Sequence, residues 1–174
     1  MMSGGTNTWN EPRPTGPKTM EFACSRNIEI DMAHRVMLHG SKCRNLHGHR
    51  YVVILTVRGE LKTEGSETGM VKDFSFLKQV LMEVIDAKYD HACCLQEDDV
   101  LLKKLRELYD MPEMKSQQNK LIGIPYTPTA ENLCYLWHEE IKQRFKELEP
   151  EIGKIKIAML EVHETPNCRA CYYE

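Results

Sequence analysis

The sequence has no long apolar segment, no excess of basic charge and no recognisable secretion signal. No apolar run approaches the roughly 18 residues of a membrane-spanning helix, so we expect no membrane partner. The net charge of −3, with both signs interspersed, offers no basic surface for nucleic acid. Seven cysteines are an odd number in a chain without a secretion signal. This favours a reduced, cytoplasmic protein over a disulfide scaffold.

The chain does contain enough apolar material for one folded domain. Its 174 residues are about the length of a single domain, and 41% of them are hydrophobic. Residues 1–20 are rich in Gly, Pro, Thr and Asn, which predicts a flexible N-terminal arm. Residues 21–174 are predicted to form one domain, with an insertion at about 97–124 that contains one short amphipathic helix.

The apolar spacing predicts an α+β fold. Alternation with a period of two predicts strands, and a stripe at helical spacing predicts helices. The predicted strands lie near 22–35, 49–61, 154–164 and 168–173, and the predicted main helices cover 74–88 and a long segment that begins at Thr129. The 154–164 run is apolar at both odd and even positions. It therefore predicts a strand covered by helices on one face and by another layer, such as a second subunit, on the other.

The most informative stretch is Cys43-Arg44-Asn45-Leu46-His47-Gly48-His49, which runs into a strand-like segment. His47 and His49 share one face of an extended chain, and Gly48 leaves the opposite face bare. His34 ends an upstream alternating run on the same face as Ile30 and Met32. If the two runs pair as antiparallel neighbours, three imidazoles meet. Three imidazoles with an open fourth position are the usual form of a catalytic zinc site.

Other interpretations of these histidines and cysteines remain open at this level. His-Gly-His by itself also fits a turn with two solvated histidines. His39 is the main rival for third ligand, although its loop position lacks the argument from a shared strand face. The pair Cys168-x2-Cys171 is a weak indication of a second metal site, because it has no partner pair.

Six short motifs, taken in order, resemble a known family. They are Ala33-His34-Arg35, Cys43-x3-His47-Gly48-His49, Gly69-Met70-Val71-Lys72-Asp73-Phe74, Asp90-His91, Pro128-Thr129-Ala130-Glu131-Asn132 and Val162-His163-Glu164-Thr165. The combination resembles the superfamily of 6-pyruvoyl-tetrahydropterin synthases and 6-carboxytetrahydropterin synthases, over roughly residues 22–92 and 125–174. The chain departs from that family at Leu95-Gln96, where a Leu-Asn pair is usual.

The resemblance implies an architecture and an assembly. It implies the tunnelling fold, in which a four-stranded antiparallel sheet carries two main helices on one face. Subunits of this fold assemble as trimers around a barrel, often stacked in pairs, so the expected state is a homotrimer or a homohexamer.

The resemblance also implies a role for each residue of the site. His34, His47 and His49 would bind Zn²⁺, and Cys43 would be the general base, with Asp90 and His91 as its proton relay. Glu164 would bind the pterin, since a carboxylate accepts two parallel hydrogen bonds from a guanidine-like edge. Thr129 and Glu131 would assist it. The local alternatives are helix capping for Thr129 and Glu131, a helix-end pair for Asp90-His91, and a solvated strand end for Glu164.

The spacing of the base and the first following ligand favours one reaction. The three-residue gap between Cys43 and His47 is similar to the 6-carboxytetrahydropterin synthases of queuosine biosynthesis, whereas the pyruvoyl synthases have a longer gap. The expected substrate is 7,8-dihydroneopterin triphosphate, and the expected products are 6-carboxytetrahydropterin, acetaldehyde and triphosphate. The alternatives are a 6-pyruvoyltetrahydropterin synthase and a non-catalytic zinc- or pterin-binding protein.

Overall fold

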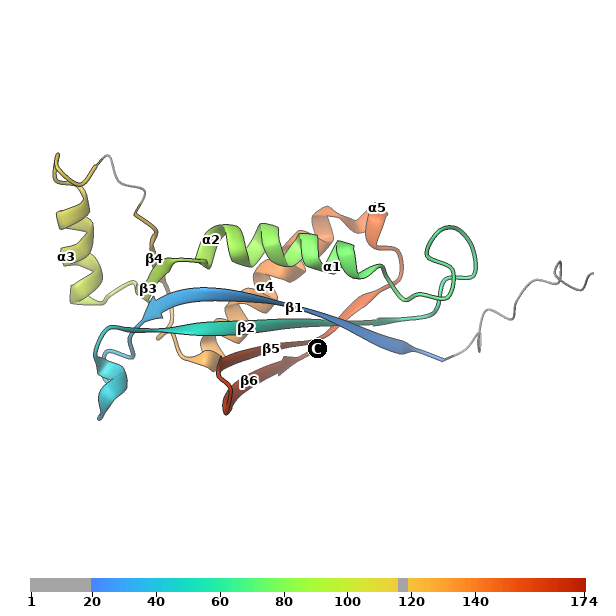
Figure 1. Ribbon diagram of the computed structural model, residues 1–174, viewed down its shortest axis with the longest axis horizontal. Coiled ribbons are helices and arrows are strands. Elements are labelled where there is room, and N and C mark those ends of the chain that lie inside the picture. Colours follow the sequence, from blue (N-terminus) through green and yellow to red (C-terminus); the bar gives the residue numbers. More distant parts are fainter. Residues whose placement is uncertain (1–19, 116–118) are drawn as a thin grey trace, which may run out of the picture.

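A curled six-stranded sheet forms the centre of the fold, and helices cover one of its faces (Figure 1). The computed structural model describes residues 20–115 and 119–174, so the N-terminal arm predicted for residues 1–20 lies outside the described residues except for Met20. The strands are β1 (Phe22–His34), β2 (His47–Gly59), β3 (Ala92–Gln96), β4 (Leu121–Ile124), β5 (Lys156–Thr165) and β6 (Cys168–Tyr173). The helices are η2 (Lys42–Arg44), α1 (Phe74–Leu81), η3 (Met82–Asp86), α2 (Ala87–Tyr89), α3 (Val100–Tyr109), α4 (Ala130–Glu147) and α5 (Glu149–Ile152).

The sheet is larger than the sequence predicts, and it is mixed. The strand order is β4-β3-β1-β2-β5-β6. The four predicted strands, β1, β2, β5 and β6, are present and pair antiparallel. The prediction of a four-stranded antiparallel sheet is nevertheless wrong, because β3 adds parallel to β1 and β4 adds parallel to β3. These two strands are only five and four residues long, too short to show a periodic pattern in the sequence.

The first helical segment runs from Phe74 to Tyr89 as one helix, with a π-helical turn, η3, in its middle. It begins as predicted after Asp73, whose carboxylate accepts a hydrogen bond of 2.6 Å from the backbone N–H of Ser75. Leu77 is buried as expected. The apolar spacing of this helix predicts that Phe74 is buried together with Leu77, but Phe74 is 56% exposed and lines a surface hollow instead.

The second long helix, α4, confirms its prediction. Thr129 is its N-cap and accepts a hydrogen bond from the backbone N–H of Asn132 at 3.3 Å. Trp137 and Ile141 on α4 are fully buried against the sheet. Together, the two helical segments and the helix-facing side of the sheet enclose one continuous hydrophobic core.

The strand β5 differs from its prediction because it contains a bulge. Thr56 pairs with Met159 and Val57 with Ile157, so Ala158 is an extra residue on β5. The bulge brings Ile157 onto the same face as Leu160, and both are buried in the core. The opposite face of β5 therefore carries Met159 followed by Glu161 and His163. The expectation of an apolar pattern on both faces is wrong.

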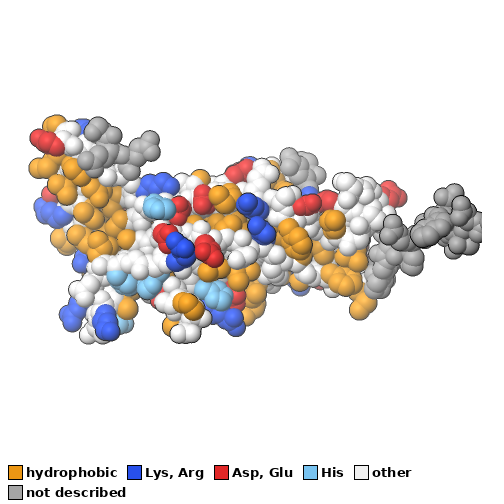
Figure 2. Space-filling model, viewed as in Figure 1, with side chains coloured by type: hydrophobic (Ala, Val, Ile, Leu, Met, Phe, Trp, Pro, Cys, Tyr) orange, Lys and Arg blue, Asp and Glu red, His pale blue; other side chains and the backbone are white. Residues whose placement is uncertain are grey.

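The segment from Gln96 to Leu121 forms α3 and leads into β4. The predicted amphipathic helix is present, but its buried residue is Leu102, whereas Val100 and Leu108 are exposed. Apolar side chains consequently gather on the surface over α3 (Figure 2). In the described part of the chain, every helix is too short or too polar to cross a membrane.

Candidate metal centre and catalytic groups

Three histidines converge at one end of the helix-facing side of the sheet. His34 is the last residue of β1 and lies directly opposite His47, the first residue of β2; His49 follows two residues later on the same face. Their ring centroids lie 4.6 Å (His34–His47), 4.9 Å (His47–His49) and 5.3 Å (His34–His49) apart. One ligand atom from each ring lies within 4.8 Å of the other two. The three rings could therefore hold one metal ion.

Backbone carbonyls orient two of the rings. His34 Nδ1 donates to the carbonyl oxygen of Pro128 at 2.7 Å, and His47 Nδ1 donates to that of Asn45 at 2.8 Å. With Nδ1 protonated, the neutral rings keep an unprotonated Nε2 for a metal. Burial is the main cause that lowers the pKa of His34, and this favours the neutral, ligating form.

Glu164 completes the environment of the cluster. It lies near the end of β5, and its Oε1 is 3.4 Å from His34 Nε2 and 4.0 Å from His49 Nε2. His34 Nε2 is buried and has no hydrogen-bond partner among the described residues. A buried nitrogen and a partly exposed carboxylate oxygen, which both carry lone pairs, thus face each other. Such an arrangement is favourable only with a positive charge between or beside them, which a metal ion supplies.

Gly48 allows the two strands to approach closely at the cluster. A Cβ at this position would lie 3.3 Å from the carbonyl oxygen of Met32 and 3.7 Å from Cα of Ala33 on β1. A larger residue between His47 and His49 would therefore crowd the backbone of β1. Because it leaves the other face of the sheet bare, a hollow of about 420 Å³ opens there, lined in part by Arg50 and His91.

Asp90 and His91 form the predicted pair, at the start of β3. His91 Nδ1 lies 2.7 Å from Asp90 Oδ2, and Asp90 Oδ1 accepts from the backbone N–H of Asp31 at 2.9 Å. Burial raises the pKa of Asp90, but the hydrogen bonds from Asp31 and His91 outweigh it and lower the pKa overall. His91 has φ 59°, a left-handed conformation that is uncommon for a residue with a side chain. This geometry holds an exposed imidazole against an ionised carboxylate.

Cys43 lies in the short helix η2, within the loop that joins β1 to β2. Its side chain is partly exposed, and its carbonyl accepts a hydrogen bond of 2.8 Å from the backbone N–H of Val36. In the described residues no hydrogen bond joins Cys43 to Asp90 or His91. Within one chain, the predicted base and its relay are therefore not hydrogen-bonded to each other.

Thr129 and Glu131 occupy the N-terminus of α4. Thr129 caps the helix, which is the local alternative that the sequence left open. Glu131 is an exposed residue in the first turn. Pro128, the residue before the cap, supplies the carbonyl that orients His34. The start of this helix thus supports the cluster through its backbone.

The rival ligands lie elsewhere. His39 is exposed in the loop, where its Nδ1 accepts from the backbone N–H of Ser41 at 3.0 Å. It is not part of the converging group found in the described chain. Cys168 and Cys171 stand three residues apart on β6, so their side chains point to opposite faces of the strand. These two cysteines cannot share one metal ion.

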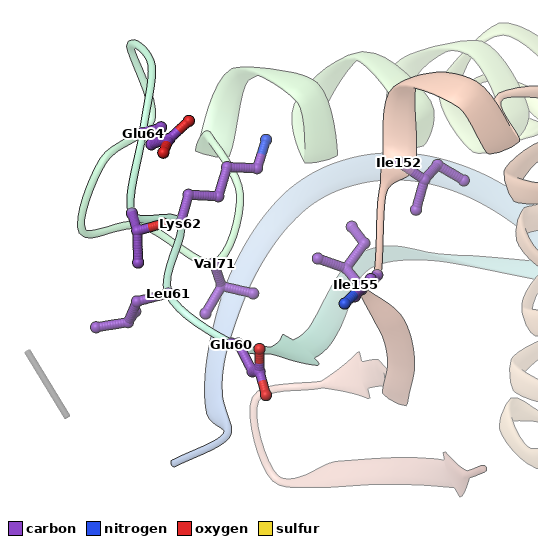
Figure 3. Close-up of a pocket in the computed structure, with 9 residues that line it drawn as sticks. Glu60, Leu61, Lys62, Glu64, Val71, Ile152 and Ile155 are labelled. Atoms are coloured by element: carbon purple, nitrogen blue, oxygen red, sulfur yellow. The ribbon is translucent and has the colours of Figure 1, made fainter. Parts of the chain in front are cut away.

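A larger hollow, of about 740 Å³, lies away from the cluster, between the loop that follows β2 and the start of β5 (Figure 3). Its lining combines apolar side chains such as Val71 and Ile155 with charged ones such as Glu60 and Lys62. The Lys62 ammonium pairs with Glu67 instead of pointing to a common centre. We therefore place the functional site at the histidine cluster.

Comparisons with known proteins identify the family of the chain. The family model described as 6-pyruvoyl tetrahydropterin synthase matches residues 23–174. The chain belongs to this family.

Among its relatives are proteins named 6-carboxy-5,6,7,8-tetrahydropterin synthase. The one from Rickettsia felis is 36% identical over 147 residues, covering 83% of this chain and 95% of the relative. The one from Haemophilus influenzae is 31% identical over 153 residues, covering 88% and 99%.

Solved structures of similar fold include an uncharacterised protein from Wolinella succinogenes (TM-score 0.73, 22% identity, 89% of this chain and 99% of that one). They also include the 6-pyruvoyl tetrahydropterin synthase of Caenorhabditis elegans (TM-score 0.59, 23% identity, 90% and 98%).

Several groups around the histidine cluster were not found from the sequence. The carbonyls of Pro128 and Asn45 carry no sequence signal, since every residue has one. Tyr51 follows His49 on the same strand face, and its ring centroid lies 5.8 Å from that of His34. Burial raises the pKa of Tyr51, so its hydroxyl stays protonated beside the cluster. The alternating pattern that places the histidines on one strand face also places Tyr51 there, so this residue could have been found from the sequence.

Proposed function

We propose that the protein is a zinc-dependent carbon–carbon lyase that converts 7,8-dihydroneopterin triphosphate to 6-carboxy-5,6,7,8-tetrahydropterin, with release of acetaldehyde and triphosphate. The observation that carries the proposal is the cluster of His34, His47 and His49 with its unpartnered Nε2 beside Glu164. Relatives named for this product, at 31–36% identity, support the choice of reaction. The setting we propose is queuosine and 7-deazaguanine biosynthesis in the cytoplasm.

The donor set suits zinc. Three neutral imidazoles and an open fourth position are typical of catalytic Zn²⁺, whereas Mg²⁺ and Ca²⁺ prefer oxygen ligands. When bound, the ion would supply Lewis acidity toward oxygens of the substrate side chain. The carbonyls of Pro128 and Asn45 would keep the rings in the ligating tautomer.

The remaining groups would bind substrate and move protons. Cys43, four residues before His47, would take a proton from the substrate side chain as its thiolate. His91, oriented by Asp90, would pass that proton on. Glu164 would accept two hydrogen bonds from the edge of the pterin ring, with help from Thr129 and Glu131. Because one chain does not join Cys43 to His91, the relay requires a second subunit, and we propose a homotrimer or homohexamer.

Product analysis tests the reaction. Purified protein is incubated with 7,8-dihydroneopterin triphosphate, the pterin is identified by mass spectrometry, and acetaldehyde is trapped with a hydrazine reagent. We expect 6-carboxytetrahydropterin and acetaldehyde in equal amounts. Accumulated 6-pyruvoyltetrahydropterin without acetaldehyde would contradict the lyase assignment, and would favour the alternative that uses the same site.

Variants separate catalysis from binding. Cys43→Ala should abolish turnover and leave the zinc content unchanged, because imidazoles alone fill the metal shell. Cys168→Ala is the matched control, since that thiol is exposed on β6 and is neither a proposed ligand nor a proposed proton-transfer group. Loss of zinc in Cys43→Ala would make the cysteine a fourth ligand of a closed structural site and favour a non-catalytic zinc protein.

A further inference from the structure

A half-buried ion pair begins one residue after His34 of the histidine cluster. Arg35 follows His34 at the end of β1, and its Nε donates to Asp99 Oδ2 at 2.7 Å, while its Nη2 donates to Asp99 Oδ1. Asp99 is 0% exposed, and no other carboxylate is buried among the residues whose side chains the structure describes. A two-point contact between guanidinium and carboxylate fixes orientation as well as distance.

The carboxylate of Asp99 also caps the start of α3. Its Oδ1 accepts a hydrogen bond of 2.7 Å from the backbone N–H of Leu101, as the N-cap of that helix. The same residue therefore begins α3 and holds Arg35. Asp99 thereby attaches α3 to the end of β1, at the left of Figure 1. The helix α3 belongs to the segment that lies outside the six motifs.

Arg35 is also the first residue of the loop that carries Cys43. The next residue, Val36, closes the neck of this loop with a backbone hydrogen bond of 2.8 Å to the carbonyl of Cys43. His47, the first residue of β2, ends the loop on the other side. A continuous path thus runs from Asp99 through the Arg35 side chain and the Val36 backbone to Cys43.

We propose that Asp99 is a positioning residue, which through Arg35 fixes the neck of the loop 35–46 and hence the place of the Cys43 thiol relative to the histidine cluster. The inference rests on the proposed function only where it takes Cys43 as the base. Displacing a reacting group by about 1 Å can cost roughly 100-fold in rate. The ion pair of Asp99 and Arg35, which we call the clamp, would therefore affect the rate of catalysis. The histidine rings have separate supports in the β1–β2 pairing and in the Pro128 carbonyl.

Asp99→Asn tests the clamp. Asparagine is as good an N-cap as aspartate, so the variant keeps the acceptor for Leu101 and loses the charged two-point contact with Arg35. We expect a folded protein with unchanged zinc content and nearly unchanged KM, and with kcat lowered by about 10- to 100-fold. Alkylation of Cys43 by iodoacetamide, followed by peptide mass spectrometry with Cys168 as internal reference, should become several-fold faster.

Two further variants control this experiment. Glu97→Gln removes an exposed two-point ion pair with Arg106 on the same segment, and should leave kcat and Cys43 alkylation at wild-type values. Arg35→Lys keeps the positive charge but loses the two-point contact with Asp99. Its kcat and its rate of Cys43 alkylation should therefore lie between those of the wild type and of Asp99→Asn. If Asp99→Asn does not fold, Arg35→Lys decides alone.

The proposal would be overturned if a folded Asp99→Asn or Arg35→Lys variant kept the wild-type kcat and the wild-type rate of Cys43 alkylation. A lower unfolding temperature as the only change would leave Asp99 with a structural role. Failure of the proposed function has a different signature, because the wild-type protein would then give no pterin product. In that case the alkylation rate still tests the position of Cys43.

Discussion

At the scale of single residues, the site divides into side chains that the sequence predicts and contacts that it does not. The alternation of β1 and β2 is sufficient to place His34, His47 and His49 on one face, because strand side chains have a fixed period of two. The contacts that orient His34 come from Pro128, which is 94 residues away along the chain. No local pattern encodes such a contact, since it depends on how α4 packs against the sheet.

The ligand assignment leads to a prediction about zinc. His34→Ala should weaken zinc binding by more than the roughly 10- to 100-fold typical of losing a residue that only supports a ligand. The measurement is zinc per chain after dialysis, followed by competition with a chelator of known affinity. His39→Ala is the matched control and should bind zinc as the wild type does. The opposite result, with His39 required and His34 dispensable, would refute the argument from the shared strand face.

A second residue-scale prediction concerns Gly48. In Gly48→Ala the new methyl group would press on the carbonyl of Met32, 3.3 Å away, and push β1 from β2. We expect a loss of about 1–3 kcal/mol in the free energy of unfolding, as for other overpacked sites, measured with urea. Gly40→Ala serves as the control, because nothing lies within 4 Å of its Cβ position. Equal stability of the two variants would mean that β1 and β2 accommodate the added methyl group at the cluster without loss of stability.

At the scale of elements, long periodic segments are predicted well and short ones are not. The helices that begin after Asp73 and at Thr129, and the four long strands, follow from apolar spacing and capping residues. The short strands β3 and β4 were missed. The pairing of β3 with β1 and of β4 with β3 is long-range, and four or five residues carry too little pattern to identify a strand. The bulge at Ala158 was missed as well, because the sequence does not record a shift in register.

The attachment of α3 gives a prediction on pH. The hydrogen bonds from Arg35 lower the pKa of Asp99 more strongly than burial raises it. A carboxyl whose pKa is lower in the folded than in the unfolded chain stabilises the fold above its unfolded pKa of about 3.9, and this stabilisation is lost as the pH falls through the folded pKa. The free energy of unfolding of the wild type minus that of Asp99→Asn should therefore stay constant between about pH 5 and 7 and shrink below about 4.

Urea unfolding of both proteins across this pH range provides the measurement. The exposed pair of Glu97 and Arg106 is the comparison, since solvent screens it and Glu97→Gln should change stability little at any pH. A wild-type advantage that persists undiminished at acid pH would mean that the Asp99 charge does not stabilise the attachment of α3.

At the scale of the whole molecule, the proposed catalytic groups lie on two sides of the sheet. The histidine cluster lies on the helix-facing side of the sheet, whereas His91 lines the hollow on the bare side, together with Arg50. That bare side, with β6 at the edge of the sheet, has no covering layer among the described residues. We propose that a neighbour's Asp90 and His91 lie beside the Cys43 of this chain and complete the relay.

Mixed assemblies test this arrangement. Cys43→Ala and His91→Ala should each be inactive alone, since each removes one half of the proposed base and relay. In a cyclic oligomer co-expressed from equal amounts of the two variants, about a quarter of the shared sites would combine an intact Cys43 with an intact His91. We therefore expect the co-expressed protein, purified through one tag on each variant, to recover a clear part of the wild-type turnover. Light scattering should give a trimer or hexamer for all three preparations. If the mixed oligomer forms and stays inactive, the cysteine and the histidine act within one chain, and the loop 35–46 must then move to bring them together.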